Sequence, residues 1–364
     1  MRIAVLGTGN GGMAAAGHLA LEGHEIRLWG RTRANFAALL LEQGAGSGRG
    51  RLEVKSIEHS GDAEIALVTD DIAKALDGAE LILVPAPAYS HDDIALAFAP
   101  HVREGQVVTF MPGNFSSVSA RRILDAAGAP PIPLLGTATL PYGARRSPGR
   151  EVVIALRTAI NPAAALPASR NSEAVAVLKR AYPEVVEASD VLDVALLNPN
   201  LPIHSSLMVT NAGPIEHFGE EYDMHADGTT PATLRVIYSI DRERIAVREA
   251  LGYGAPHYEQ ETYYDKSRQG EGLFGRAAST LVEESGLWRE RLSMDHRYLD
   301  EDIAYGVSLI SEAGRVAGVP TPTTDSLIQV ASVLRGLELR GRGRNLAMLG
   351  LNGLSPEQLR AKLR

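Results

Sequence analysis

In the first half of the chain, short apolar runs alternate with stretches whose apolar residues recur at helical spacing. Strand-length apolar runs separated by helices predict a parallel sheet with helices on both faces, because parallel strands are usually joined by a helical crossover. The predicted strands lie at 2–7, 24–30, 64–69, 79–87, 106–113, 131–138 and 151–157, and the predicted helices at 11–22, 34–42, 71–77, 90–99 and 116–127.

The pattern changes after about residue 188, where the strand-like runs stop. A final helix is predicted for "SPEQLRAKLR", in which Ser355 can cap the N-terminus, Pro356 suits the first helical position and Gln358 completes a capping box. We therefore expect a Rossmann-type, doubly wound α/β domain over 1–188 and an all-helical domain over 189–364. The junction near 185–200 is expected to form the wall of a substrate cleft. The other helices of this half are predicted at 205–218, 231–251, 275–286, 301–317 and 322–338.

Size and composition agree with two globular domains. The chain has 364 residues, of which 45% are hydrophobic and 22% are charged, and one core rarely serves so long a chain. A net charge of −8 and a pI near 5.7 argue against nucleic acid or an anionic membrane as the main partner. No apolar stretch suits a transmembrane helix, and the short apolar N-terminus is typical of a strand rather than a signal peptide. We expect a cytoplasmic metabolic protein, with a homodimer possible although no dimer seam stands out.

A glycine-rich loop follows the first predicted strand and opens the first predicted helix. It places Gly7, Gly9 and Gly12 in the spacing G-x-G-x-x-G. The first glycine permits a tight turn, the second lets the backbone approach a pyrophosphate, and the third allows close packing of helix on strand. The amides of Asn10 and Gly11 would then point at phosphate oxygens. The segment predicts a dinucleotide site, and a glycine turn that serves packing alone is the alternative.

The end of the second predicted strand bears on which nicotinamide cofactor is bound. NAD-selective enzymes carry Asp or Glu here to accept hydrogen bonds from the ribose hydroxyls. This chain has Gly30 at that position, followed by Arg31 and Arg33. Guanidinium groups suit a 2′-phosphate because they can donate two hydrogen bonds to its oxygens. We expect NADP as the preferred cofactor and NAD otherwise; a solvated arginine pair in a surface turn is the alternative interpretation.

Polar segments in the helical half indicate a catalytic site. Asp302 falls at the predicted start of a helix, where the helix dipole favours an ionised carboxylate. Such a carboxylate could accept a hydrogen bond from His204, fix its tautomer and raise its pKa, which would produce an acid–base pair. Arg297 could clamp a substrate carboxylate with two hydrogen bonds, or form a salt bridge to the acidic residues 300–302. The segments are "NPNLPIH" (198–204), "HADGTTP" (225–231) and "DHRYLDEDIAYG" (295–306).

Two prolines interrupt the first of these segments. We expect Pro199 and Pro202 to prevent a helix from starting early. Asn198, Asn200 and His204 would then lie on a fixed, irregular strip that faces the substrate. A proton-transfer residue benefits from neighbours that are in place before the substrate arrives.

Motifs along almost the whole chain resemble the opine dehydrogenases of the octopine and nopaline type. The resemblance implies an enzyme that couples an amino acid to a 2-oxo acid and reduces the resulting imine with a nicotinamide cofactor. By position, it implies His204 as the catalytic histidine with Asp302 as its partner, Arg297 as the substrate arginine, Asn200 or Asn198 beside the histidine, and Pro85 and Ala86 at the cofactor. The motifs are "GTGNGG" (7–12), "VPA" (84–86), N-x-N-x-x-x-H (198–204), "DGTTP" (227–231), "DRERIAVREALG" (241–252) and "RYLDEDIAYG" (297–306).

The chain departs from the family pattern at two positions, and other classes of protein stay open. Gly136 stands where the family usually has Glu, and Ser205 follows the histidine where many relatives have proline. Glycerol-3-phosphate, ketopantoate and 3-hydroxy acid dehydrogenases share the two-domain plan but depend on a catalytic lysine near the domain junction. Lys179 and Lys266 are the only lysines in that region, and Lys179 lacks the companion asparagine expected four residues later. A catalytically silent NADP-binding sensor is a further alternative. We expect no metal site, because no standard ligand spacing is present among His217, Glu220, Asp223 and His225.

Overall fold

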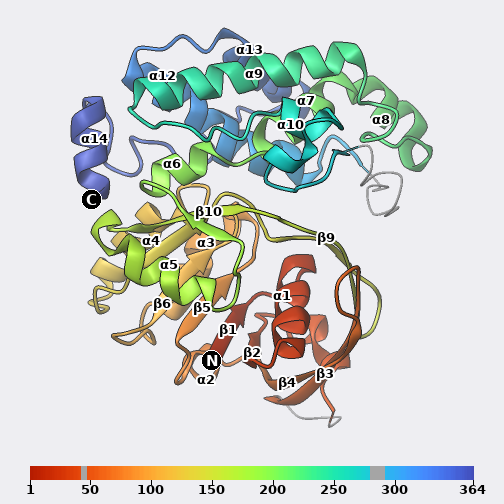
Figure 1. Ribbon diagram of the computed structural model, residues 1–364, viewed down its shortest axis with the longest axis vertical. Coiled ribbons are helices and arrows are strands. Elements are labelled where there is room, and N and C mark those ends of the chain that lie inside the picture. The colour runs from red at the N-terminus through yellow and green to blue at the C-terminus, as the bar shows by residue number, and fades with distance from the viewer. Residues whose placement is uncertain (42–46, 279–291) are drawn as a thin grey trace. The chain divides into compact units, whose positions relative to one another are not determined.

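The chain forms two compact units in the computed structural model, Met1–Val191 and Leu192–Arg364 (Figure 1). The structure describes residues 1–41, 47–278 and 292–364. Within these ranges, no helix is long and apolar enough to cross a membrane. The first unit is an α/β fold, and the described part of the second contains helices and no strand.

A mixed, 11-stranded sheet forms the centre of the first unit. Its central strands are parallel in the order β7–β6–β5–β1–β2–β4. Further strands extend both edges, and the β3–β4, β8–β9 and β7–β10 pairings are antiparallel. The strands are β1 (Arg2–Leu6), β2 (Glu25–Trp29), β3 (Ser47–Ser56), β4 (Gly61–Thr69), β5 (Leu81–Val84), β6 (Val107–Phe110), β7 (Leu134–Thr137), β8 (Tyr142–Arg146), β9 (Glu151–Arg157), β10 (Asn161–Leu166) and β11 (Val185–Glu187).

Helices cover both faces of this sheet, and the doubly wound α/β prediction is confirmed. Ile3 and Val5 of β1 belong to one core, which α1 and α5 complete. Ala4 and Leu6 of the same strand belong to a second core with α2, α3 and α4. Successive side chains point to opposite faces, so a strand covered on both faces is apolar throughout. The helices are α1 (Asn10–Leu21), α2 (Ile72–Leu76), α3 (His91–Phe98), α4 (Ser116–Ala126) and α5 (Asn171–Lys179).

The sequence pattern missed most of the edge strands and misassigned one helix. β3, β8, β10 and β11 were not predicted, because they are short, alanine-rich or interspersed with charged and glycine residues. The helix predicted at 34–42 is wrong: two single-turn 3₁₀-helices, η1 (Arg33–Asn35) and η2 (Ala37–Leu39), occupy this stretch. No side chain caps either turn, and Phe36 and Leu39 are both buried in the sheet core.

The second unit is a cluster of helices, in which the long helix α9 packs against α7, α12 and α13. The capping box predicted at its last helix is confirmed: Ser355 accepts from the Gln358 amide, and the Gln358 side chain accepts from the Ser355 amide. The elements are α6 (Val191–Leu196), α7 (Asn200–Thr210), α8 (Ala212–Phe218), η5 (Gly219–Glu221), α9 (Pro231–Ala250), α10 (Glu261–Tyr264), η6 (Gln269–Glu271), η7 (Tyr298–Val307), α12 (Ser308–Ala317), α13 (Pro322–Arg335) and α14 (Pro356–Leu363).

The irregular strip predicted before residue 205 is wrong, because α7 already begins at Asn200. Pro199 is the N-cap residue and Pro202 lies in the first turn. The first amides of a helix have no partner within the helix, so a proline there loses no hydrogen bond. The prolines therefore mark the start of the helix rather than delaying it. The helix predicted at 275–286 lies largely outside the described residues.

Candidate active site

The glycine loop lies where the strand order of the sheet reverses. From β1 the chain builds β2 and β4 on one side, and it then returns to build β5 and β6 on the other. In such sheets a crevice forms beyond the carboxyl ends of the strands at the switch point, and dinucleotides bind there. The loop after β1 and the Pro85–Ala86 segment after β5 flank this switch point.

The glycines of the loop fit a dinucleotide for separate steric reasons. Gly7 adopts φ +139°, a conformation that favours glycine. A Cβ at Gly12 would lie 1.9 Å from the Gly7 carbonyl oxygen, so only glycine allows α1 to pack this closely. A Cβ at Gly9 would meet nothing within 4 Å, which leaves open space on the side where a pyrophosphate would approach. A Cβ at Gly11 would lie 3.3 Å from the Pro85 carbonyl oxygen, so the loops after β1 and β5 are close neighbours.

The segment after β2 combines a packing glycine with exposed arginine. A Cβ at Gly30 would lie 2.8 Å from side-chain carbons of both Phe36 and Thr8, so this position has no space for an acidic residue. The Arg31 side chain is 78% exposed and lies 3.8 Å from the Asp93 carboxylate, which leaves it accessible to a ligand. The acidic residue expected of an NAD-selective enzyme is therefore absent at Gly30, and the neighbouring Phe36 and Thr8 side chains leave no room for one.

Arg146 of β8 lies at the glycine loop, although the sequence analysis did not identify it. Its guanidinium donates to the carbonyl oxygens of Thr8 at 2.9 Å and Asn35 at 3.2 Å, and its amide donates to the Asn10 side chain at 3.0 Å. These contacts link the loop after β1 to the segment after β2. No local motif reveals this role, since residue 146 is brought to residue 8 only by the pairing of β8 at the sheet edge.

In the helical unit, the structure brings His204 and Asp302 together. The Nδ1 atom of His204 lies 2.9 Å from Oδ2 of Asp302, and the side chains are only 12% and 8% exposed. The sequence predicted Asp302 at the start of a helix, and this prediction is wrong. Asp302 lies inside η7, a π-helical stretch that begins at Tyr298. The dipole expected to keep it ionised is therefore lost. Burial instead raises the pKa of Asp302 to about 7, and the positive charge of Arg297 opposes this rise.

Aromatic side chains fix the plane of the His204 imidazole. Tyr298 stacks on it with ring centroids 3.9 Å apart and an interplanar angle of 22°. His225 approaches it edge-on at 5.9 Å, and the Arg297 guanidinium lies 5.1 Å from the Tyr298 ring centroid. Neither Tyr298 nor His225 was predicted as a site residue, although both belong to polar segments that the sequence analysis singled out.

The other residues predicted in the helical unit lie in or next to the two elements that hold this pair. Arg297 precedes η7 and donates to the Glu301 carboxylate at 3.0 Å, so the salt bridge considered as its alternative role is present. The Arg297 side chain is nevertheless 44% exposed, whereas that of Glu301 is 4% exposed. Asn200 lies one helical turn before His204 on α7, and its amide donates to the buried Asn198 side chain at 3.0 Å.

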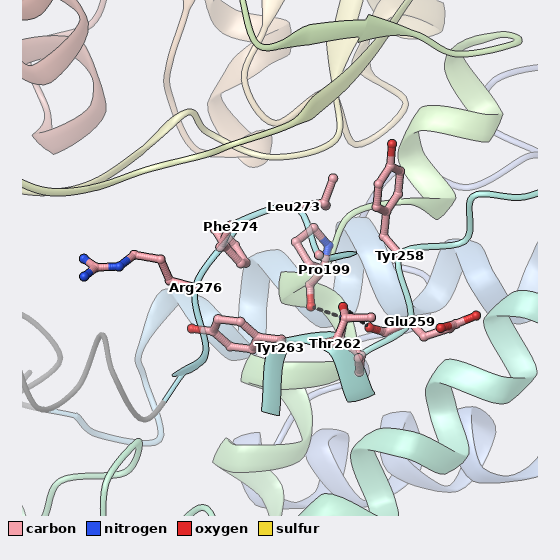
Figure 2. Close-up of a pocket in the computed structure, with 10 residues that line it drawn as sticks. Pro199, Tyr258, Glu259, Thr262, Tyr263, Leu273, Phe274 and Arg276 are labelled. Atoms are coloured by element: carbon pink, nitrogen blue, oxygen red, sulfur yellow. Dashed lines mark hydrogen bonds between the residues drawn. The ribbon is translucent and has the colours of Figure 1, made fainter. Parts of the chain in front are cut away.

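A small hollow lies beside the start of α7 (Figure 2). Pro199 and several aromatic residues line this hollow, and the Arg276 side chain extends away from it. Its interior has space for about one water molecule, which is too little for the side chain of an amino-acid substrate. Among the described residues, no group of three or more His, Cys, Asp or Glu side chains could hold a metal ion. The lining residues are Pro199, Tyr258, Glu259, Gln260, Thr262, Tyr263, Gly272, Leu273, Phe274 and Arg276.

Comparison with known proteins defines the class to which these two units belong. The family model of the NAD-dependent glycerol-3-phosphate dehydrogenase N-terminus matches residues 2–123. The model of the NAD/NADP octopine/nopaline dehydrogenase alpha-helical domain matches residues 187–335. The class is that of dehydrogenases that combine a nicotinamide-nucleotide domain with a helical domain.

Similarity over the full length then identifies the family. The opine dehydrogenase of Arthrobacter sp. (strain 1C) is 30% identical over 366 residues, which cover 98% of this chain and 97% of that protein. The protein ocs of Agrobacterium vitis is 26% identical, over 97% of this chain and 96% of the relative. The chain belongs to the opine dehydrogenase family, as the sequence motifs predicted. It is an NAD(P)-dependent oxidoreductase that acts on CH–NH bonds.

Solved structures confirm the fold. An octopine dehydrogenase in complex with NADH and L-arginine superposes with a TM-score of 0.70 at 21% identity, covering 99% of this chain and 95% of that one. A yersinopine dehydrogenase with NADP⁺ bound gives 0.64 at 15% identity, covering 100% and 97%.

Proposed function

We propose that His204 and Asp302 form the acid–base pair with which this enzyme reductively condenses an amino acid and a 2-oxo acid. The observation that carries the proposal is the 2.9 Å contact between His204 Nδ1 and Asp302 in a largely buried setting. With Nδ1 held by the carboxylate, Nε2 is the atom that exchanges a proton with the substrate. The carboxylate fixes the tautomer and stabilises the imidazolium when it forms.

The chemistry requires one group that can both take up and release a proton. Attack of the amine on the keto carbon gives a carbinolamine, and protonation of its hydroxyl by His204 lets water leave and the imine form. A bound nicotinamide cofactor supplies the hydride that reduces the imine carbon. The protein holds the imidazole in place through the Asp302 contact and the Tyr298 stack, so little reorganisation is needed when charge develops.

We assign Arg297 to a substrate carboxylate. Its side chain is partly exposed, and its guanidinium lies over the Tyr298 ring, which in turn stacks on His204. Nη1 of Arg297 donates to Glu301, and a planar guanidinium has five N–H donors, so it can bind a second carboxylate while this contact persists.

We propose that NADPH is the preferred hydride donor. Gly30 offers the ribose no acceptor, and the exposed Arg31 with Arg33 supplies positive charge for a 2′-phosphate. Solved structures of this fold contain either NADH or NADP⁺, so the fold itself accommodates both.

The decisive experiment measures NADPH oxidation over a matrix of amino acids and 2-oxo acids, with the wild type and His204→Ala. Loss of a general acid–base group should lower kcat by about 10² to 10⁴-fold. NADPH affinity should stay within about twofold, because the glycine loop belongs to the other unit.

The matched control is His217→Ala, a histidine of α8 on the surface of the same unit. It should turn over at the wild-type rate. Near-normal turnover in His204→Ala would contradict the assignment. A wild type that binds NADPH but turns over no pair of substrates would favour the sensor interpretation instead.

A further inference from the structure

His91 ties together two loops at the carboxyl edge of the sheet. It is the first residue of α3 and is fully buried. Its Nε2 lies 2.7 Å from the carbonyl oxygen of Ala86, in the loop after β5. Its Nδ1 lies 2.6 Å from the hydroxyl of Ser116, the first residue of α4, which follows the loop after β6.

In the neutral form of the imidazole, the two contacts determine which nitrogen carries the proton. A carbonyl oxygen can only accept a hydrogen bond, so Nε2 carries the proton and donates to Ala86. Nδ1 is then the acceptor, and Ser116 donates to it through its hydroxyl. The ring also packs against Phe110, with centroids 5.0 Å apart. His91 is thereby held on three sides, and through it the Ala86 carbonyl has one defined position.

The backbone of the second loop adopts a demanding conformation next to this bridge. Asn114 and Phe115 both have positive φ, at 40° and 62°, which is uncommon for residues other than glycine. Such conformations persist only where surrounding contacts hold them, and they are frequent at ligand sites. Ser116 follows directly, so its hydrogen bond to His91 anchors the end of this strained loop.

The topology assigns a ligand to these loops. A dinucleotide lies across the switch point of the sheet, with its adenosine half on the side of the glycine loop and β2. The other half therefore lies on the side of β5 and β6, next to the loops that His91 connects. Pro85 and Ala86 already border the glycine loop through the Pro85 carbonyl.

We infer that His91 is a positioning residue for the nicotinamide half of the cofactor, acting through the Ala86 carbonyl and the loop after β6. It does not touch the reacting atoms. The inference rests on the cofactor class of the family, and it is independent of the roles proposed for His204 and Asp302.

The test compares the binding of whole and partial cofactors to the full-length protein. His91→Phe keeps an aromatic ring against Phe110 and removes both hydrogen bonds. Titration should show a Kd for NADPH or NADH raised about tenfold, since one buried hydrogen-bond bridge is lost. The Kd of 2′-phospho-ADP-ribose or ADP-ribose, which lack nicotinamide, should change by less than about twofold.

Two further variants separate this role from a general loss of folding. Ser116→Ala removes only the donor to Nδ1 and should shift the dinucleotide Kd in the same direction by a smaller factor. His91→Gln keeps an N–H donor and should fall between the wild type and His91→Phe. Equal losses for the dinucleotide and the ribose fragment would overturn the inference, as would unchanged binding of both. A wild-type protein that binds neither ligand would count against the cofactor assignment itself.

Discussion

At the scale of single residues, the proposed chemistry depends on a carboxyl group that is buried without a full salt bridge. Burial raises the pKa of Asp302 to about 7, and Arg297 only partly offsets this effect. The nearest partner of the carboxyl group is the His204 ring, which is itself largely buried. The pair therefore changes its charge near neutral pH, where a general acid–base group is most effective.

We predict that kcat/KM falls as the pH drops through about 7. Below this pH Asp302 is protonated and can no longer stabilise the imidazolium of His204. Steady-state rates with saturating cofactor should show this inflection in the wild type. In Asp302→Asn the rate should be low throughout, and the inflection should be missing. A wild-type profile that is flat across neutral pH would contradict the assignment.

The same titration should appear in the stability of the protein with the opposite sign. A carboxyl group with a raised pKa keeps its proton in the folded state at pH values where the unfolded chain has released it. The free energy of unfolding therefore contains a contribution that is fully present below the ordinary aspartate pKa of 3.8 and is lost as the pH rises from there through about 7. Urea unfolding of the wild type and Asp302→Asn should show the wild type losing stability relative to the variant over this interval.

We predict that Arg297→Lys weakens binding of the carboxylate substrate more than binding of the cofactor. Lysine keeps the charge but cannot donate a planar pair of hydrogen bonds while it also holds Glu301. The KM of the 2-oxo acid or of the amino acid should rise about tenfold or more, as expected for loss of a charged hydrogen bond. The Kd of NADPH should be unchanged. Arg276→Lys, whose side chain extends away from the hollow in Figure 2, is the control in the same unit.

At the scale of elements, short segments at the ends of strands and helices hold most of the candidate functional residues. The glycine loop follows β1, the arginine segment follows β2, and the His91 bridge joins the loops after β5 and β6. In the helical unit, His204 lies one turn into α7 and Asp302 lies in the π-helical η7. π-Helical turns often occur at functional sites, where the wider turn changes the direction in which a side chain points.

The segment after β2 carries the prediction on cofactor choice. Replacing both Arg31 and Arg33 by alanine should raise the Kd of NADPH about tenfold or more, because a dianionic 2′-phosphate loses two charged donors. The Kd of NADH should change by less than about twofold, and it serves as the internal control. Equal effects on the two cofactors would show that these arginines do not select NADP. Gly30→Asp is unsuitable for this purpose, because any side chain there would collide with Thr8 and Phe36.

At the scale of the whole molecule, the proposed roles are divided between the two compact units. The nucleotide-binding unit ends at Val191, and the proposed catalytic pair lies entirely in the unit that begins at Leu192. A ligand stabilises the part of a protein that must be folded for the ligand to bind.

We predict that NADPH raises the thermal stability of the first unit selectively. At a concentration of about 100 times its Kd, a ligand that binds only the folded state adds about 2.7 kcal/mol. Calorimetry should show the upward shift, and hydrogen exchange should show protection at the glycine loop and at residues 85–91. His204→Ala should keep the full shift, because it leaves the nucleotide-binding unit intact. Loss of the shift in this variant would contradict the division of roles.

The sequence by itself determined the features that depend on local order along the chain. The alternation of apolar runs with helical spacing predicted the doubly wound sheet, and the spacing of Gly7, Gly9 and Gly12 predicted the nucleotide loop, because both follow from the periodicity of strands and helices. The family motifs also pointed to the pairing of His204 with Asp302.

Only the tertiary structure decided the features that depend on contacts between distant residues. Burial, rather than a helix terminus, sets the charge of Asp302. The Tyr298 stack on His204, the reach of Arg146 to Thr8 and the contact of His91 with Ser116 each join residues far apart in the chain. No spacing rule connects such residues, since their approach is fixed by the pairing of strands and the packing of helices.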